Sequence, residues 1–156
     1  MIRKAHLSDL EAIHQLYIVL FDGMASLVAD YLKPAEQERD FLLSVLRGEN
    51  DMMVFVVEEE ADIKGFAIAQ LQNTPPYTCM VQQRSVYLID LVVDPRSRSK
   101  GYGKQLLDAV KEWGTSRQVS FMELSVLAKN TKAIELYERE GFEAYDFSMR
   151  IRLEDK

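Results

Sequence analysis

The stretch Asp94–Trp113, DPRSRSKGYGKQLLDAVKEW, is the part of the sequence that decides the fold. Its first half concentrates basic residues and glycines, although the whole chain carries a formal net charge of -6. Its second half is amphipathic, with apolar residues at helical spacing: Leu106, Leu107, Val110 and Trp113. The apolar run Val86–Asp94 precedes it and predicts a strand that is buried on both faces. A buried strand, a glycine-containing basic loop and a helix therefore follow one another here.

Such a loop favours binding of an anion. A helix N-terminus presents unpaired N–H groups and the positive end of the helix dipole, and glycines let the backbone approach a phosphate closely. Positive charge comes from Arg96, Arg98, Lys100 and Lys104. The pattern is neither a P-loop, which needs an earlier glycine and a following Ser or Thr, nor a dinucleotide fingerprint, which needs a third glycine. The local residues favour a phosphate or pyrophosphate site, with a solvated basic turn that caps the helix as the alternative.

Two motifs carry a resemblance to a known family. Arg98-Ser99-Lys100-Gly101-Tyr102-Gly103 resembles the Arg/Gln-x-x-Gly-x-Gly/Ala signature of the GNAT superfamily of acetyl-CoA-dependent N-acetyltransferases. It follows a buried strand that ends in VVDP. Further along, NTKAIELYEREGF (residues 130–142) resembles the second signature of that family, Asn-x-x-Ala-x-x-x-Tyr-x-x-x-Gly-Phe. The order of the expected elements fits the family over the whole chain.

The resemblance implies a binding site for acetyl-CoA, used as co-substrate. The backbone amides of the loop would hold the CoA pyrophosphate: Arg98, Ser99, Lys100, Gly101, Tyr102, Gly103 and Lys104. The exposed edge formed by Leu91, Val92 and Val93 would pair with the pantetheine arm, beside a bulge that splays two parallel strands. Asn130 would, by its position in the motif, help to hold the pantetheine or cap its helix, for which Asn is favoured in any case.

The rest of the pattern predicts the element order β-α-α-β-β-β-α-β-α-β. We expect a helix from a capping box of Ser8 and Glu11 to about Asp22, and a second helix from Pro34 to Gly48. Strands are expected at residues 1–5, 52–59, 65–72, 86–94, 119–127 and, with one apolar face and near an edge, 144–153. The order implies an α/β fold with a mixed (α+β) sheet and helices on both faces. The resemblance implies a GNAT-like fold, with roughly six to seven mostly antiparallel strands and a splayed parallel pair at the centre.

Acetyl transfer to an amine needs a base and an acid. A lysine-like amine has a pKa of roughly 10.4 and arrives protonated, while the departing thiolate gains from a proton donor. Tyr137 matches the family tyrosine that points at the CoA sulfur, with helix packing as the alternative role. The candidates for the base are Asp90, in the middle of the apolar strand, and Glu123 in FMELSV. For each of them the alternative is a structural carboxylate without a catalytic role.

The central strand departs from one branch of the family. VYLIDLVV is similar to the diamine acetyltransferases, which carry a Glu-Asp pair there, but Ile89 stands at the glutamate position. Alternation along a strand predicts that Ile89 and Asp90 point to opposite faces, so that Asp90 would not replace the missing group. Some members use a glutamate on the next strand, at the position of Ser125, and Glu123 shares a face with it.

The bulk composition sets the remaining expectations. At 156 residues the chain suits a single N-acetyltransferase domain over 1–156. The excess of 25 Asp and Glu over 19 Lys and Arg disfavours nonspecific nucleic-acid binding, and no apolar run approaches the roughly 20 residues of a membrane helix. The single cysteine, Cys79, fits a cytoplasmic protein. One cysteine and two histidines provide too few ligands for a zinc site, so no metal is expected. A one-faced last strand and the family resemblance make a homodimer plausible.

The sequence thus predicts an N-acetyltransferase that modifies a primary amine of a small molecule or a peptide within a ternary complex. An aromatic and acidic acceptor pocket would come from two loop regions, with candidates at Asp22, Asp30, Tyr31 and Tyr77, which ordinary loop residues explain equally well. Two alternatives stay open. One is acetylation of a protein N-terminus or lysine, and the other is a noncatalytic acyl-CoA sensor or interaction module on the same fold.

Overall fold

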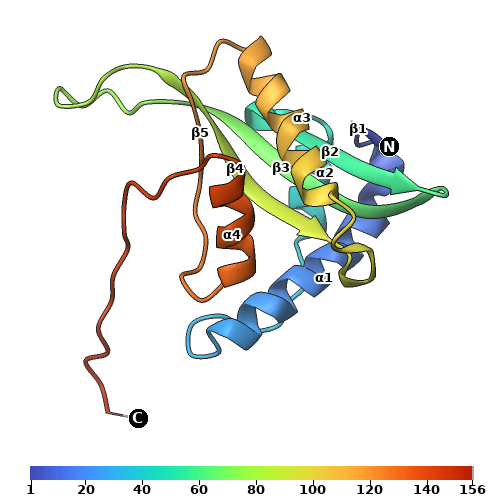
Figure 1. Cartoon of the computed structure of the whole chain (residues 1–156), viewed down its shortest axis with the longest axis horizontal. Coiled ribbons are helices and arrows are strands. Elements are labelled where there is room, and N and C mark those ends of the chain that lie inside the picture. The colour runs from blue at the N-terminus through green and yellow to red at the C-terminus, as the bar shows by residue number, and fades with distance from the viewer. Residues whose placement is uncertain (156) are drawn as a thin grey trace.

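The computed structural model describes residues 1–155 and consists of one mixed sheet with helices packed on it (Figure 1). The strands of the described chain lie in the order β1-β2-β3-β4-β5, and only β4 and β5 are parallel neighbours. Their bounds are β1 Ile2–Lys4, β2 Met52–Glu59, β3 Asp62–Asn73, β4 Arg84–Val93 and β5 Phe121–Leu124. The mixed sheet with its parallel pair is confirmed, and the strand count is slightly lower than the sequence predicted.

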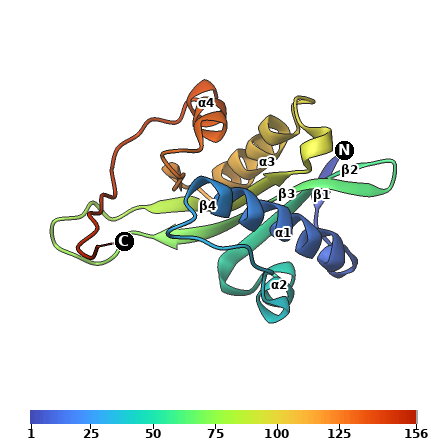
Figure 2. The same ribbon diagram turned by 90° about the horizontal axis from the view of Figure 1, so that it is seen from below.

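Helices cover both faces of the sheet, as predicted. On one face α1 (Leu10–Leu27) and α2 (Arg39–Leu46) enclose a core centred on Tyr17 and Phe66. On the other face α3 (Tyr102–Ser116) and α4 (Thr131–Arg139) lie together, as Figure 2 shows. β3 is buried on both faces over its middle, because its alternate residues feed the two cores in turn.

The starts of the first two helices differ from the prediction. At the start of the first helix the stabilising side chain is Asp9 rather than Ser8. Its carboxylate accepts a 2.7 Å hydrogen bond from the His6 N–H and pairs with Arg3 at 2.8 Å. The helix α1 then extends to Leu27. The second helix begins at Arg39 instead of Pro34, since residues 34–40 are mostly polar and offer little apolar face to bury.

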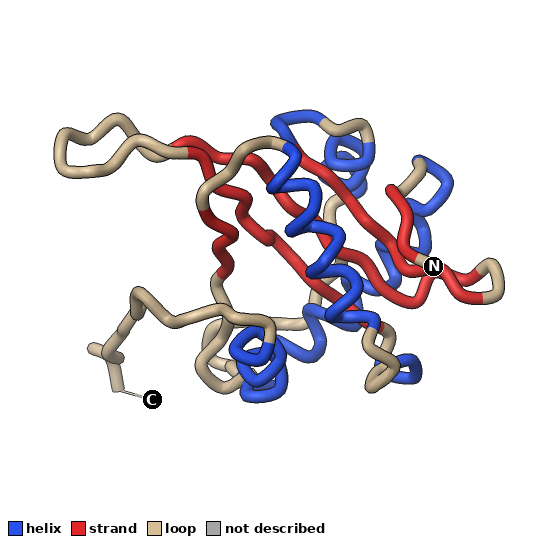
Figure 3. Tube along the Cα trace, turned by 45° about the horizontal axis from the view of Figure 1, so that its top comes forward, coloured by secondary structure: helices blue, strands red, loops and turns tan. Residues whose placement is uncertain are grey.

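The predicted last strand is the largest difference. Residues 144–153 are extended but join no sheet in the described chain, and Figure 3 shows this segment as a loop that leaves the body. A strand needs a neighbouring edge for its backbone hydrogen bonds, and within one copy of the chain this segment lies beside none. Its apolar side chains are therefore left in solvent, with exposed fractions from 76% at Tyr145 to 92% at Met149 and Leu153.

Candidate active site

A bulge in β4 opens the sheet at its centre. Opposite Ile68 and Ala69 on β3 stand Asp90 and Leu88, so Ile89 is an extra residue without a partner in the register. A bulge bends its strand and increases the local twist. The parallel pairing of β4 with β5 accordingly ends at Leu88, and the two strands diverge beyond it (Figure 3). This divergence also makes β5 shorter than the predicted strand over residues 119–127.

The divergence leaves a cavity of about 110 Å³. Its walls come from α1, the bulged part of β4, the end of β5 with the following loop, and α4. The lining residues are Leu20, Met24, Leu88, Ile89, Asp90, Leu91, Leu124, Ser125, Val126, Leu127, Asn130, Ala133 and Tyr137. Asp90, Tyr137, Asn130 and Leu91, predicted as site residues, thus meet in one place. Val92 and Val93 continue the same open edge of β4, which has no β5 partner in the described chain.

Asp90 is the half-buried carboxylate of this cavity. The hydroxyl of Tyr17, a fully buried residue of α1, donates a 2.5 Å hydrogen bond to Asp90 Oδ2. Burial raises the pKa of Asp90 to about 6, against the opposing effect of the Tyr17 hydrogen bond. Burial and the charge of Asp90 also raise the pKa of Tyr17, so its hydroxyl remains a donor. The carboxylate is therefore a stronger proton acceptor than an ordinary aspartate.

The predicted orientation of Ile89 and Asp90 is wrong. Ile89 packs against the core beneath α1 and α2, and Asp90 bonds to Tyr17 in the same core. Both side chains face this layer because the extra residue of the bulge interrupts the strict alternation of the strand. The sequence does not identify Tyr17 as a site residue, because its position on the apolar stripe of α1 predicts only a packing role. A phenol at such a position needs a buried acceptor, and this is the signal that points to Asp90.

Tyr137 reaches the cavity from α4. Its ring packs edge-on against Phe142 with 5.6 Å between centroids, so the predicted packing role is present as well. Burial, with a smaller contribution from the negative charge of Asp90, raises the pKa of Tyr137 to about 12. Within residues 1–155 its hydroxyl donates no hydrogen bond. The phenol is thus protonated, lines the cavity and has a donor to offer.

The position of α4 is fixed by three residues. Asn130 caps the helix, since its Oδ1 accepts from the Ala133 N–H at 3.2 Å. A Cβ on Gly103 would lie 3.1 Å from Leu136, so this glycine lets α3 and α4 pack closely. Gly141, with φ +94°, follows the end of the helix in the left-handed conformation that glycine commonly adopts after a helix C-terminus. The capping role of Asn130 and its place on the cavity wall are compatible with each other.

Glu123 lies apart from this group. It stands on β5 opposite Tyr87 in the parallel register and is not among the residues of the cavity wall. Its neighbour Ser125 does line the cavity and accepts a 3.1 Å hydrogen bond from the Tyr87 hydroxyl. The structure therefore brings Asp90 and Tyr137 together and leaves Glu123 outside.

The loop after β4 presents a run of unpaired amides. In the part of the chain that the structure describes, none of the N–H groups of residues 98–104 donates to a backbone carbonyl. Ser99 (φ 65°) and Gly101 (φ 81°) adopt left-handed conformations, which turn successive N–H groups toward one side. The helix α3 begins immediately afterwards and adds the positive end of its dipole. These donors suit a phosphate or pyrophosphate.

The cations of this loop are mostly paired. Arg96 contacts Asp94 at 3.0 Å, Lys100 contacts Glu59 at 3.2 Å, and Lys104 contacts Asp108 at 2.7 Å. Arg98 makes no ion pair with any described residue and reaches only the carbonyl of Val93, at 3.3 Å. Its charge is the one in the loop that no carboxylate of the described chain offsets.

The predicted acceptor residues are not gathered into one pocket. None of Asp22, Asp30, Tyr31 and Tyr77 lines the cavity between β4 and β5. Asp30 instead pairs with Arg150 and Arg152 at 3.1 Å each, and Arg150 lies over the Tyr31 ring. Across residues 1–155 no group of three or more His, Cys, Asp or Glu side chains is placed to hold a metal ion. Nor is any helix in that range long and apolar enough to cross a membrane.

Comparison with known proteins places this geometry in a family. Residues 11–142 match the family model described as "Acetyltransferase (GNAT) family". The chain is 28% identical over 144 residues to the uncharacterized N-acetyltransferase YhfO of Bacillus subtilis (strain 168), covering 91% of this chain and 89% of YhfO. It is 28% identical over 143 residues to the uncharacterized N-acetyltransferase MJ1207 of Methanocaldococcus jannaschii, covering 91% of this chain and 60% of MJ1207.

Solved structures agree with this placement. A crystal structure of a mutant BH1408 protein from Bacillus halodurans superposes with a TM-score of 0.92 at 26% identity, over 98% of this chain and 99% of that one. The aminoglycoside N-acetyltransferase AAC(6')-Iy in complex with CoA superposes with a TM-score of 0.74 at 23% identity, over 99% and 100% of the two chains. At that identity the second likeness shows the fold alone.

Proposed function

Since this chain belongs to the GNAT family of acetyltransferases and is an N-acetyltransferase, we propose that it transfers an acetyl group from acetyl-CoA to a primary amine of a small molecule or a peptide. The observation that carries the proposal is the meeting of Asp90 and Tyr137 on one cavity, where β4 leaves β5. One group is a proton acceptor with a raised pKa and the other a protonated phenol. Transfer from a thioester to an ammonium needs this pair of functions.

The residues present fit acetyl-CoA as co-substrate. The unpaired amides of Arg98, Ser99, Lys100, Gly101, Tyr102, Gly103 and Lys104 would bind the pyrophosphate, and the unpaired charge of Arg98 would add to them. The free β4 edge at Leu91, Val92 and Val93 would pair with the amide groups of the pantetheine arm. Asn130, on the wall beside Tyr137, would border that arm while capping α4.

The chemistry assigns one proton transfer to each group. Acetyl-CoA, when bound, supplies the thioester carbonyl that the amine attacks directly, in a ternary complex. Asp90 accepts the proton that the ammonium must lose, directly or through a water, and its pKa of about 6 makes it competent at neutral pH. As the new N–C bond forms and the C–S bond breaks, Tyr137 donates its proton to the departing sulfur. Glu123 is the alternative base, and its place outside the cavity makes Asp90 the stronger candidate.

The proposal also covers the extent of the domain, the cellular compartment and the partners of the protein. Residues 1–156 form a single N-acetyltransferase domain, and the match of the family model to residues 11–142 supports this. The lone exposed Cys79 is compatible with a reducing cytoplasm, and the acidic balance of the chain argues against a nucleic-acid partner. A homodimer without a membrane or nucleic-acid partner is the expected form. The second candidate is acetylation of a protein N-terminus or lysine, since the predicted acceptor residues do not line the cavity between β4 and β5.

The test is acetyl-CoA-dependent thiol release against pooled amines. The pools are polyamines, aminoglycosides, amino acids and peptide N-termini, each assayed with the parent protein and with Asp90→Asn. We expect release with one pool, and that pool gives the acceptor class. In the variant this release should fall by about 10²–10⁴-fold. Release that depends on no amine would contradict acetyl transfer to an acceptor. Binding of acetyl-CoA with silence in every pool would overturn the small-amine assignment in favour of a macromolecular acceptor or an acyl-CoA sensor.

A further inference from the structure

One face of α1 forms a wall of the cavity between β4 and β5. Leu20 and Met24 line the cavity and follow Tyr17 at helical spacing, so the three side chains share a face of the helix. Under the proposed function the pantetheine arm lies along the free edge of β4 and beside Asn130. The acceptor amine would therefore approach between α1 and the bulge of β4, where Asp90 accepts its proton.

The wall around Asp90 on this side is apolar. Leu20 and Met24 on α1 and Ile89 at the bulge all line the cavity and are half-buried, so each exposes apolar surface that a ligand can cover. Covering such surface is favourable by an amount that grows with its area. An apolar substituent on the amine would gain this free energy, whereas a polar substituent would leave its own hydrogen-bonding groups unpaired there.

The cavity offers a single negative charge. Asp90 is the one carboxylate on the cavity wall within residues 1–155. Burial raises the pKa of Asp90 and the Tyr17 hydrogen bond lowers it, with no charged side chain of the described chain among the causes. Likewise, Asp90 is the one charged residue in that range that raises the pKa of Tyr137. The reacting ammonium takes this counter-charge, and a second ammonium would find no other.

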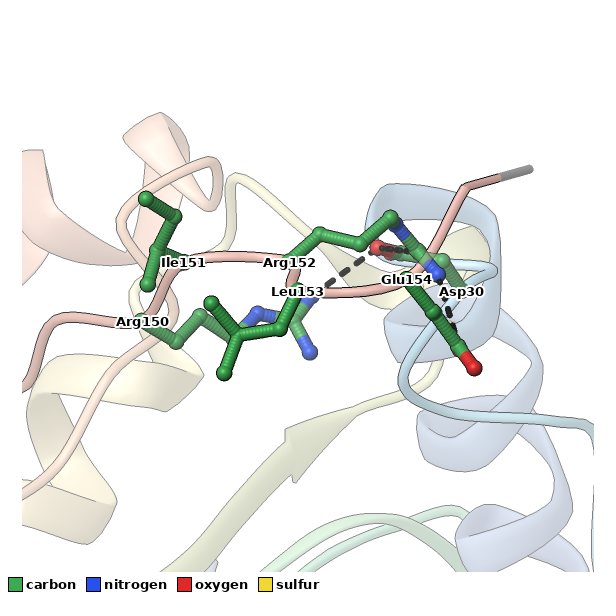
Figure 4. A pocket seen from close by; sticks show the side chains of 6 residues that line it. All are labelled: Asp30, Arg150, Ile151, Arg152, Leu153 and Glu154. Carbon is green, nitrogen blue, oxygen red and sulfur yellow. Dashed lines mark hydrogen bonds and ion pairs between the residues drawn. The ribbon is translucent and has the colours of Figure 1, made fainter.

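The predicted acidic residues beside α1 do not supply the missing charge. Asp30, in the connection between α1 and α2, accepts hydrogen bonds from Arg150 and Arg152 at 3.1 Å each, and Figure 4 shows it beside both guanidinium groups. Its charge is therefore already balanced. Asp22 is exposed and lies off the cavity wall. Neither carboxylate is placed to pair with a cation inside the cavity.

The cavity is also small and has few free polar atoms. Its volume of about 110 Å³ lies below the roughly 300–1,000 Å³ of pockets that enclose drug-sized ligands. On its wall, Asn130 Oδ1 accepts from the Ala133 N–H, and Ser125 Oγ accepts from the Tyr87 hydroxyl. A large acceptor rich in hydroxyl groups would therefore leave most of its hydrogen-bonding groups outside the cavity or unpaired.

We propose that the acceptor of this N-acetyltransferase is a monoamine with an apolar substituent, and that Leu20, Met24 and Ile89 select against acceptors with a second ammonium. A polyamine or an aminoglycoside would place a further positive charge on this apolar wall, without a carboxylate to pair with. Among the four amine pools of the thiol-release assay, peptide N-termini with an apolar first residue meet the requirement. The inference rests on the proposed acetyl transfer and adds the chemical class of the acceptor.

Thiol release with two amines of equal length tests this class. Hexylamine and 1,5-diaminopentane have the same number of non-hydrogen atoms, but the diamine carries an ammonium in place of the terminal methyl group. We expect kcat/KM for hexylamine to exceed that for the diamine by at least about tenfold. Among shorter alkylamines kcat/KM should rise about fourfold for each methylene that the cavity covers.

The outcomes separate the acceptor class from the reaction. A diamine that is used as well as hexylamine, or better, would overturn the acceptor class and leave acetyl transfer intact. Thiol release with neither these amines nor any of the four pools, although acetyl-CoA binds by calorimetry, would overturn both the class and the proposed function.

Met24→Glu tests whether the wall sets the preference. About 10 Å along the helix axis separates residue 24 from Tyr17, the partner of Asp90, a span within reach of an extended diamine. The new carboxylate should pair with the second ammonium and raise the ratio of kcat/KM for the diamine to that for hexylamine at least about tenfold. An unchanged Kd of acetyl-CoA shows that the variant is folded.

Ser26→Glu is the matched control for Met24→Glu. It adds the same charge to α1 at an exposed position that does not line the cavity, so the ratio should stay at the value of the parent. An unchanged ratio in Met24→Glu, or the same change in both variants, would overturn the assignment of this wall to acceptor selection.

Discussion

The loop after β4 and the middle of the same strand build their parts of the site in different ways. The loop uses the backbone N–H groups of consecutive residues, 98–104, and needs only a few left-handed conformations to present them. The middle of β4 uses one side chain, that of Asp90. Its proton affinity is set by burial and by a hydrogen bond from Tyr17, 73 residues away in the sequence. A backbone site is local and tolerant of side-chain changes, whereas a side-chain site depends on the packing of the whole domain. Substitutions in the two regions should therefore separate cofactor binding from turnover.

Asp90→Asn should give the largest difference between the effect on turnover and the effect on acetyl-CoA binding. The amide keeps the volume of the carboxyl group but cannot accept the proton of the ammonium, and general base catalysis is typically worth about 10²–10⁴-fold. We expect kcat/KM for the amine to fall by that factor, while the Kd of acetyl-CoA measured by calorimetry stays within about twofold. The unchanged Kd follows because the amides of the loop do not involve Asp90.

Glu123→Gln is the matched comparison for this carboxylate. It removes the same charge from the neighbouring strand, outside the cavity wall. Activity within a few-fold of the parent supports Asp90 as the base. A loss as large as that of Asp90→Asn would place Glu123 in the proton path, and a loss in Glu123→Gln alone would exclude Asp90 as the base.

Tyr137→Phe should have the next largest effect. The phenylalanine keeps the edge-on packing against Phe142 but removes the proton that the departing thiolate needs. We expect kcat to fall by roughly 10²-fold, with an unchanged Kd of acetyl-CoA and a melting temperature close to that of the parent. An acceptor-saturated kcat equal to that of the parent would show that Tyr137 acts only in packing.

Gly101→Ala perturbs the loop instead. A Cβ at Gly101 would meet only the Gln105 Nε2 atom, at 4.0 Å, which is ordinary contact, but its φ of +81° is costly for alanine by about 1–2 kcal/mol. If the left-handed turn is what presents the amides, the Kd of acetyl-CoA should rise roughly tenfold while kcat at saturation is retained. Gly141→Ala is the control, since it places the same residue at φ +94° in open space at the end of α4. Equal Kd values for the two variants would break the proposed link between the loop and the pyrophosphate.

These two regions also differ in how far the sequence predicts them. The loop, the helix after it and the Asn130 cap follow from local patterns of a few residues, and the structure has each of them. The orientation of Asp90 was missed because a bulge is one extra residue that no alternation pattern reveals, and its bond to Tyr17 depends on how α1 packs on the sheet. The strand predicted at 144–153 has the right periodicity, but it lies beside no unpaired sheet edge in the described chain, and periodicity alone does not supply a pairing partner.

The smallest effect is expected from Tyr17→Phe, which should change the pH dependence of kcat/KM more than its value at high pH. The Tyr17 hydrogen bond lowers the pKa of Asp90, while burial raises it to the resulting value of about 6. Removing the hydroxyl leaves burial unopposed, so the pKa of Asp90 should rise further. A base works only when deprotonated, so kcat/KM should rise with pH through about 6 in the parent and at a higher pH in the variant. At pH values well above both midpoints the two enzymes should differ by no more than a few-fold.

The direction of that shift distinguishes positioning from packing. Tyr17 lies in the core against Phe66, with 4.9 Å between ring centroids, and a loss of packing would lower stability without moving a titration midpoint. Tyr87→Phe is the control, because its hydroxyl bonds to Ser125 rather than to Asp90, and its acid limb should coincide with that of the parent. A midpoint that moves in neither variant would mean that the titrating base is a group other than Asp90. A midpoint that moves to lower pH in Tyr17→Phe would contradict the sign of the hydrogen-bond effect, because loss of a donor cannot make a carboxylate easier to ionise.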